Sequence, residues 1–191
     1  LSRDFGAYGH TPETLVTAAL SAHGLAVINT GSPYAVEPGM VRTGGGTRYR
    51  VYTPYYRQWV QYAFVAPVPT ASANWIDPPA SHRIDAHREL AEQQSDVQLP
   101  DVGEGAAWRR WDRFKANALT EYDTARNRPD IDGTSSLSAH LRWGEIHPRS
   151  LLADLTAYLN DPATAVGATT FVKEIAWREF YADVWDANPT S

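Results

Sequence analysis

The chain has 191 residues, a formal net charge of −5 and no cysteine, which excludes disulfides, thiolate zinc sites and a cysteine nucleophile. Its apolar fraction of 43% is high enough for a buried core and excludes a disordered chain. No apolar run reaches the length of a membrane span, and the absence of cysteine fits a cytoplasmic protein. Seven tryptophans and ten tyrosines are expected mainly in the core, and such an excess is also typical of stacking surfaces for flat ligands.

The N-terminal part predicts one helix and one strand of an α/β layer. The helix is expected in TPETLVTAALSAHG, with Thr11 at the N-cap, Pro12 at the first helical position and Gly24 at the end. LAVINT, residues 25–30, has the pattern of a short buried strand. Because a lone strand cannot form a sheet, we expect the remaining strands of this layer to lie outside the sequence.

A second helix is predicted in TPYYRQWVQYAF, with Thr53 as its N-cap and Pro54 at its first position. Residues 65–104 are rich in Pro, Ala, Ser and acidic residues and have poor periodicity, which is typical of an interdomain linker. His82 and His87 lie in this segment, five residues apart and therefore on different helical faces. We interpret them as solvated loop residues rather than metal ligands.

The remainder of the sequence is predicted to be helical. AAWRRWDRFKANALTEYDTARN carries an apolar stripe at helical spacing, made of Trp108, Trp111, Phe114, Ala118, Leu119 and Tyr122. A short helix follows DGTSSLS, another begins at Pro148, and the last covers TTFVKEIAWREFYADVWD, residues 169–186. The helix after Pro148 directs four leucines inward, namely Leu151, Leu152, Leu155 and Leu159. The fold class is therefore mainly α.

Residues 132–138, DGTSSLS, offer four hydroxyls and a glycine directly before a helix. Short hydroxyl side chains and free backbone N–H groups at such a place are typical of an anion site. Simple helix capping is the alternative, and it is favoured for an isolated TSS sequence. Tyr122 and Arg126, one helical turn apart, would suit a phosphate beside this loop. Alternatively, Tyr122 closes the apolar stripe and Arg126 is solvated.

The last helix carries a stripe that is both charged and aromatic. Its members are Glu174, Trp177, Arg178, Tyr181 and Trp185. Glu174 and Arg178, four residues apart, could simply form an ion pair. That pair does not explain the three aromatic residues on the same side, so the stripe favours a flat, polar ligand.

Basic residues also gather locally despite the negative net charge. They include Arg42, Arg48, Arg50 and Arg57, then Arg109, Arg110, Arg113, Lys115, Arg126 and Arg128, and finally Arg142 and Arg149. Such a patch can face phosphates, although solvated helix faces explain most of these arginines equally well. No sequence motif of a hydrolase is present.

These segments resemble a known family. EYDTARNRPDIDGTSSLSAHLRWGEIHPRSLL, followed by FVKEIAWREFYADV, resembles the first part of the flavin-binding helical domain of DNA photolyases and cryptochromes. GSPYAVEPGMVRTGGGTRYRVYTPYYRQW is similar to the end of their N-terminal α/β domain. The resemblance is strongest to bacterial photolyases that act on cyclobutane pyrimidine dimers. It implies an internal fragment with an α/β Rossmann-like remnant in 1–64, an interdomain linker in 65–104 and the beginning of the FAD-binding helical domain in 105–191.

The resemblance also implies roles for individual residues. Those at the FAD cofactor are Tyr122, Thr134, Ser135, Ser138, Phe171, Glu174 and Arg178. Those at the DNA are Arg126, Glu174, Trp177, Arg178 and Tyr181. Glu174 would hydrogen-bond the pyrimidine dimer and Trp177 would pack on it, which makes these two the expected catalytic pair. The sequence departs from many relatives at Ser136, where arginine is common, and at Phe171, where tryptophan is common.

The function implied by the resemblance is light-dependent DNA repair. The enzyme would flip a pyrimidine dimer out of UV-damaged DNA, and reduced FAD would donate the electron that splits it. The alternatives are a cryptochrome-type flavin photoreceptor without repair activity, and a fragment that is inactive by itself because half of the flavin pocket is missing. The full-length protein is expected to be a monomer, and no membrane is expected among its partners. Any antenna pigment would bind mostly outside this sequence.

Overall fold

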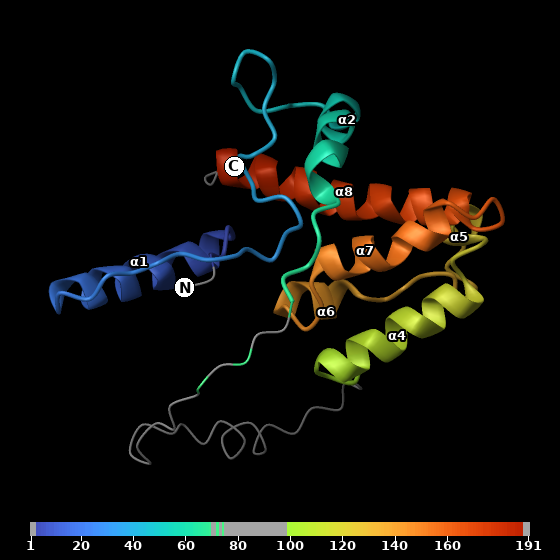
Figure 1. Ribbon diagram of the computed structural model, residues 1–191, viewed down its shortest axis with the longest axis horizontal. Helices are drawn as coiled ribbons and strands as arrows, with labels where there is room; N and C mark the ends of the chain where they lie inside the picture. The colour runs from blue at the N-terminus through green and yellow to red at the C-terminus, as the bar shows by residue number, and fades with distance from the viewer. Residues whose placement is uncertain (1–2, 70–71, 73, 75–98, 189–191) are drawn as a thin grey trace. The chain divides into compact units, whose positions relative to one another are not determined.

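The computed structural model describes residues 3–69, 72, 74 and 99–188. The chain divides into two units, one formed by Leu1–Pro67 with Val102–Ser191 and the other by Val68–Asp101. His82 and His87, and most of the predicted linker, lie outside the described residues. All of the helices named below belong to the first unit. Figure 1 labels them as α1 (Ala7–Ala22), α2 (Tyr52–Ala63), α4 (Glu104–Asn117), α5 (Tyr122–Ala125), α6 (Ser138–Trp143), α7 (Pro148–Leu159) and α8 (Ala165–Ala187).

The predicted mainly helical fold is confirmed, but the predicted strand over residues 25–30 is wrong. The described residues contain no strand, and their one isolated β-bridge joins Arg42 to Arg48 around a glycine-rich turn. The side chain of Ile28 is 72% exposed instead of buried. A strand is stable only beside a neighbouring strand, and the described residues contain no second strand for this segment.

Helix α1 begins one turn earlier than the sequence pattern predicted. Gly6 is its N-cap, and Pro12 lies inside the helix rather than at its first position. The Oδ1 atom of Asp4 accepts a hydrogen bond of 2.8 Å from the Gly6 N–H, which fixes the turn before the helix. The predicted end is confirmed, because Gly24 follows the helix with a φ of +73° that favours glycine.

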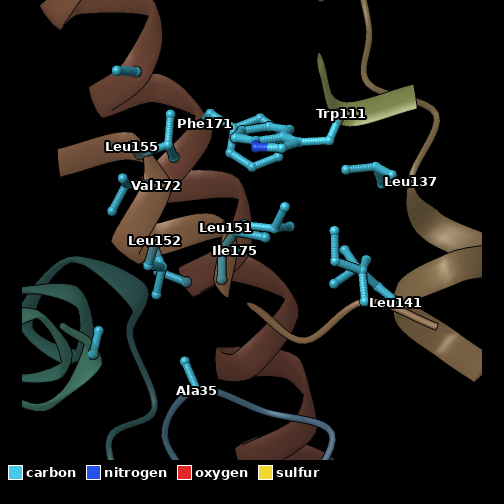
Figure 2. Packing of buried hydrophobic residues seen from close by; sticks show 14 of the residues in the cluster. Ala35, Trp111, Leu137, Leu141, Leu151, Leu152, Leu155, Phe171, Val172 and Ile175 are labelled. Atoms are coloured by element: carbon cyan, nitrogen blue, oxygen red, sulfur yellow. The ribbon is translucent and has the colours of Figure 1, made fainter. Parts of the chain in front are cut away.

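Helices α2 and α7 each pack against α8, and the core also includes residues of α4. Helix α2 begins at Tyr52 after Val51, before the predicted cap, and buries Tyr55, Trp59 and Ala63. Helix α7 begins at Pro148 as predicted, and the leucines it buries are Leu151, Leu152 and Leu155. Figure 2 shows these leucines facing Val172 and Ile175 of α8, with Trp111 of α4 beside Phe171.

Helix α8 and the segment after α4 approach each other at backbone distance. The sequence predicted an apolar stripe at helical spacing from Trp108 to Tyr122, but α4 ends at Asn117 and the chain turns before α5. A Cβ atom placed on Gly167 of α8 would lie only 1.7 Å from the carbonyl oxygen of Leu119. Because only glycine allows this approach, Gly167 places α5 directly against α8.

Candidate functional site

The charged and aromatic stripe of α8 divides between two neighbouring parts of the fold. Glu174 and Trp177 lie toward α5 and α2, whereas Arg178 points toward the loop around residues 33–35 and toward α6. The other two members of the stripe, Tyr181 and Trp185, have side chains that are 63% and 45% exposed. The five residues share one side of the helix as predicted, but they do not share one environment.

Glu174 forms an ion pair with Arg126, which α5 brings to the side of α8. The guanidinium carbon of Arg126 also lies 5.9 Å from the ring centre of Tyr122. The alternative pair between Glu174 and Arg178 is therefore not formed, because the packing of α5 on α8 provides a different cation. The result is a carboxylate held in place by a long-range partner at the surface of the fold.

Trp177 lies among three aromatic rings. The ring of Tyr52, from α2, stacks on it with a centroid distance of 3.5 Å and an interplanar angle of 7°. Tyr181, one turn further along α8, is also nearly parallel at 5.6 Å and 24°, and Phe180 meets it edge-on at 5.7 Å. The Tyr52 hydroxyl donates to the Lys173 carbonyl oxygen at 2.9 Å, and burial raises the pKa of this phenol. The indole is therefore oriented by fixed neighbours.

Arg178 is used by the fold itself. Its Nη1 donates to the Pro33 carbonyl at 3.0 Å, its Nη2 donates to the Leu141 carbonyl at 3.2 Å, and the guanidinium lies 4.5 Å from the Tyr34 ring centre. Burial lowers the pKa of this guanidinium, and the nearby acid Glu179 acts in the opposite direction. These bonds direct Arg178 away from Glu174 and connect three segments that are far apart in sequence.

The hydroxyl loop borders a hollow of about 250 Å³ together with α4. Thr134 and Ser135 line it from the loop, Arg110 and Arg113 line it from the helix, and Asp132 contributes one carboxylate. Two guanidinium groups with two hydroxyls match the needs of a phosphate, and the single acid only partly offsets their charge.

The other hydroxyls of this loop lie outside that lining. Ser138 is exposed at the first position of α6. Ser136, where many relatives carry arginine, has a φ of +49°, and its hydroxyl lies 3.4 Å from that of Thr134. The predicted hydroxyl cluster is therefore divided, with Thr134 and Ser135 toward the arginines and Ser138 turned to solvent.

Tyr122 and Phe171 belong to a buried aromatic cluster. The Tyr122 ring lies 5.1 Å from Phe114 and 5.6 Å from Phe171, and Phe171 lies 5.0 Å from Trp111. Burial raises the pKa of the Tyr122 phenol. Both residues therefore belong to the buried core, and Tyr122 also contacts Arg126. The burial of Tyr122 agrees with its interpretation as the end of the apolar stripe.

Sequence reasoning missed Glu179, which is 1% exposed. Its two carboxylate oxygens accept from the Ala35 N–H at 2.5 Å, the Val36 N–H at 2.9 Å and the Trp59 indole N–H at 2.7 Å. Burial raises its pKa to about 7, although these three donors act in the opposite direction. A signal was available, because Glu179 falls at helical spacing among the apolar core positions of α8, where an acid is unusual.

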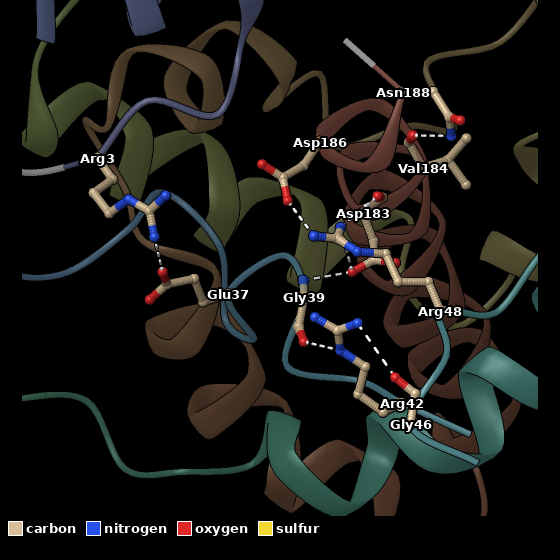
Figure 3. A network of polar contacts seen from close by, with 10 residues as sticks. All are labelled: Arg3, Glu37, Gly39, Arg42, Gly46, Arg48, Asp183, Val184, Asp186 and Asn188. Atoms are coloured by element: carbon tan, nitrogen blue, oxygen red, sulfur yellow. Dashed lines mark hydrogen bonds and ion pairs between the residues drawn. The ribbon is translucent and has the colours of Figure 1, made fainter. Parts of the chain in front are cut away.

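Asp183, one turn beyond Glu179, is also 1% exposed and was also missed. Its Oδ1 accepts from the Gly39 N–H at 2.6 Å and from Arg48 Nη1 at 3.3 Å, while Arg48 Nη2 bonds to Asp186 at 2.5 Å (Figure 3). Burial raises the pKa of the Asp183 carboxyl. With Glu179, these contacts fasten the loop before α2 onto α8.

Two further findings concern metal ligands and membrane spans. No group of three or more metal-ligating side chains is found among residues 3–69 and 99–188 or the two described positions between them. In the part of the chain that the structure describes, no helix has the length and apolar character of a membrane span.

Comparison with known proteins identifies the fold. The chain superimposes on a bacterial class III photolyase from Agrobacterium tumefaciens with a TM-score of 0.81 and 26% identity, over 98% of this chain and 40% of that protein. A sequence model described as DNA photolyase matches residues 1–73. The fold thus matches the helical domain of a photolyase.

Curated relatives agree with this comparison. Proteins named deoxyribodipyrimidine photo-lyase are 32% identical in Alkalihalophilus pseudofirmus over 78% of this chain, 29% in Halobacterium salinarum over 96%, and 31% in Escherichia coli over 81%. The chain belongs to the DNA photolyase family, as its motifs predicted. It spans 31%, 40% and 33% of the lengths of these three relatives.

Proposed function

We propose that this chain is part of a light-driven DNA-repair lyase that splits cyclobutane pyrimidine dimers with the help of reduced FAD. One observation carries the proposal: α8 presents a fixed carboxylate, Glu174, and an oriented indole, Trp177, less than one helical turn apart. Their spacing supports one ligand that offers both a flat face and an N–H donor. The relatives named deoxyribodipyrimidine photo-lyase make a damaged pyrimidine pair the best candidate for this ligand.

The two residues would act on a flipped-out lesion in different ways. The indole of Trp177 provides a plane for a pyrimidine, and base–aromatic stacking contributes about 1–3 kcal/mol per base. The carboxylate of Glu174 accepts from a pyrimidine N–H and thereby fixes the rotation of the lesion on that plane. Flipping costs least where damage has already weakened base stacking, so the pocket would select damaged sites.

The residues of the hydroxyl loop fit the phosphates of FAD. Thr134 and Ser135 would donate hydroxyl hydrogens, and Arg110 and Arg113 would neutralise charge across the hollow. When bound, reduced FAD supplies an electron upon excitation by light. The protein's own contribution is to hold the lesion near the cofactor and to exclude water, with Tyr122 and Phe171 forming the rigid support behind the site.

A cryptochrome-type photoreceptor is the second candidate function. A sensor needs a flavin site but has no need of a carboxylate and an indole facing a lesion, so Glu174 and Trp177 favour repair. We also propose that the 191-residue chain alone is inactive, because it covers only 31–40% of the relatives above.

The test uses a protein that contains this chain together with the remaining length of its relatives. Trp177→Ala should weaken binding of a dimer-containing oligonucleotide in the dark by roughly 5- to 150-fold, the equivalent of one stacked base, while FAD stays bound. Trp143→Ala is the matched control, because Trp143 is 79% exposed and lies outside the site. Blue light should then remove dimers from the bound DNA.

Three outcomes would contradict parts of the proposal. A flavin-loaded protein that binds the lesion but never repairs it would be a photoreceptor. Equal loss of FAD and of DNA binding in Trp177→Ala would mean that this tryptophan only supports the fold. Retention of FAD by the 191-residue chain through gel filtration would show that the chain alone is sufficient for cofactor binding.

A further inference from the structure

One face of Trp177 is covered by the ring of Tyr52. Tyr52 stacks on the indole at 3.5 Å, and it is itself held by the hydrogen bond of its hydroxyl to the Lys173 carbonyl at 2.9 Å. Tyr52 also contacts Tyr56 at 5.8 Å and Phe180 at 5.9 Å. A ring with this many contacts cannot leave without opening the packing between α2 and α8. Only the other face of the indole can receive a base.

Tyr181 has the opposite properties. It lies nearly parallel to Trp177 at the longer distance of 5.6 Å, and its side chain is 63% exposed. Its other ring contact is with Phe180, which precedes it in the chain, at 5.7 Å. Exposed side chains change rotamer on the picosecond to nanosecond scale, so Tyr181 can leave the indole without disturbing the core.

We infer that Tyr181 is a displaceable cover, which occupies the face of Trp177 that Tyr52 leaves free and which a flipped pyrimidine must displace. This inference rests on the proposed function, because it assigns the uncovered indole to the lesion. It gives Tyr181 a role opposite to that of a DNA contact: the tyrosine stacks on Trp177 in the absence of DNA and competes with the base. The cover would shield a large aromatic surface from water when no lesion is bound.

The sign of one substitution separates the two roles. Tyr181→Ala removes the competing ring, so affinity for an oligonucleotide with one thymine dimer should rise about 2- to 10-fold, which corresponds to one aromatic pair. If Tyr181 instead contacts DNA, the same substitution should lower the affinity. Tyr181→Phe keeps the ring and should bind as the unchanged protein does, which tests the ring rather than the hydroxyl.

A second measurement needs no DNA. The fluorescence of Trp177 in the 191-residue chain is obtained as the difference between the unchanged chain and Trp177→Phe. Quenching of this difference signal by acrylamide reports how accessible the Trp177 indole is to solvent. Tyr181→Ala should increase that quenching, whereas Tyr62→Ala, which removes an exposed tyrosine near the other end of α2, should not.

The outcomes distinguish this inference from the proposed function. Unchanged quenching in Tyr181→Ala, or a dimer affinity that stays equal or falls while Trp177→Ala still weakens binding, overturns the cover and leaves the repair proposal standing. If Trp177→Ala does not weaken dimer binding, the proposed role of Trp177 fails and the cover fails with it. Increased quenching together with tighter dimer binding supports both.

Discussion

Glu179→Gln should change how the free energy of unfolding depends on pH. Glu179 lies in the core between α8, α2 and the loop at Ala35, with its carboxylate 1% exposed. Burial raises its pKa from the ordinary value of 4.5 to about 7, even though three N–H donors favour the charged form. Glutamine has nearly the same shape but cannot ionise, so it imitates the protonated acid at every pH.

The sign follows from linkage between protonation and folding. A carboxyl whose folded pKa is raised binds its proton more tightly in the folded state. Its contribution to stability is therefore fully present below pH 4.5 and is lost as the pH rises through about 7. A difference of 7 minus 4.5 is 2.5 pKa units, which at 1.36 kcal/mol per unit amounts to about 3 kcal/mol. Relative to Glu179→Gln, the free energy of unfolding of the unchanged protein should fall by this amount between pH 4.5 and about pH 7.

The assay is urea unfolding of both proteins at half-unit steps from pH 4 to pH 8, followed by fluorescence. The difference between the two free energies isolates Glu179, because groups common to both proteins cancel to first order. Such groups include two whose pKa burial shifts in the fold. Burial lowers the pKa of His147, and burial raises the pKa of Asp183, which lies one turn from Glu179.

Two results would refute the reasoning about Glu179. A difference that stays constant with pH would mean that the carboxyl does not titrate in this window. A difference of opposite sign, with the unchanged protein gaining stability as the pH rises, would mean that its three hydrogen bonds outweigh burial and hold the folded pKa below 4.5.

Two further predictions concern packing around α8. Gly167→Ala should destabilise the protein by about 1–3 kcal/mol or more in urea unfolding, because its new Cβ would lie 1.7 Å from the Leu119 carbonyl oxygen. Gly105→Ala is the control, since its Cβ would meet nothing closer than 3.5 Å in α4, and a stabilisation of up to about 1 kcal/mol is expected. Equal effects would contradict the close approach. Arg178→Lys should cost about 1–3 kcal/mol, because one ammonium cannot reach both carbonyls that the guanidinium joins; an unchanged urea midpoint would exclude this role.

Much of the helical order could be predicted from sequence. Pro148 marked the start of α7, and three of the four leucines predicted to point inward are buried while Leu159 is partly buried, because both signals depend only on neighbours along the chain. The boundaries were less predictable. Helix α1 extends past Pro12 toward the N-terminus, and residues 25–30 form no strand, since a strand depends on neighbouring strands that local sequence does not specify.

The candidate site shows the same division. The sequence alone placed Glu174, Trp177 and Arg178 on one side of α8, because helical periodicity fixes which residues share a face. Only the tertiary structure decided their partners. Arg126 reached Glu174 from a distant segment, Tyr52 covered one face of Trp177, and two backbone carbonyls took the guanidinium of Arg178. Such contacts form between residues remote in sequence, and packing of whole helices, rather than spacing along one of them, selects them.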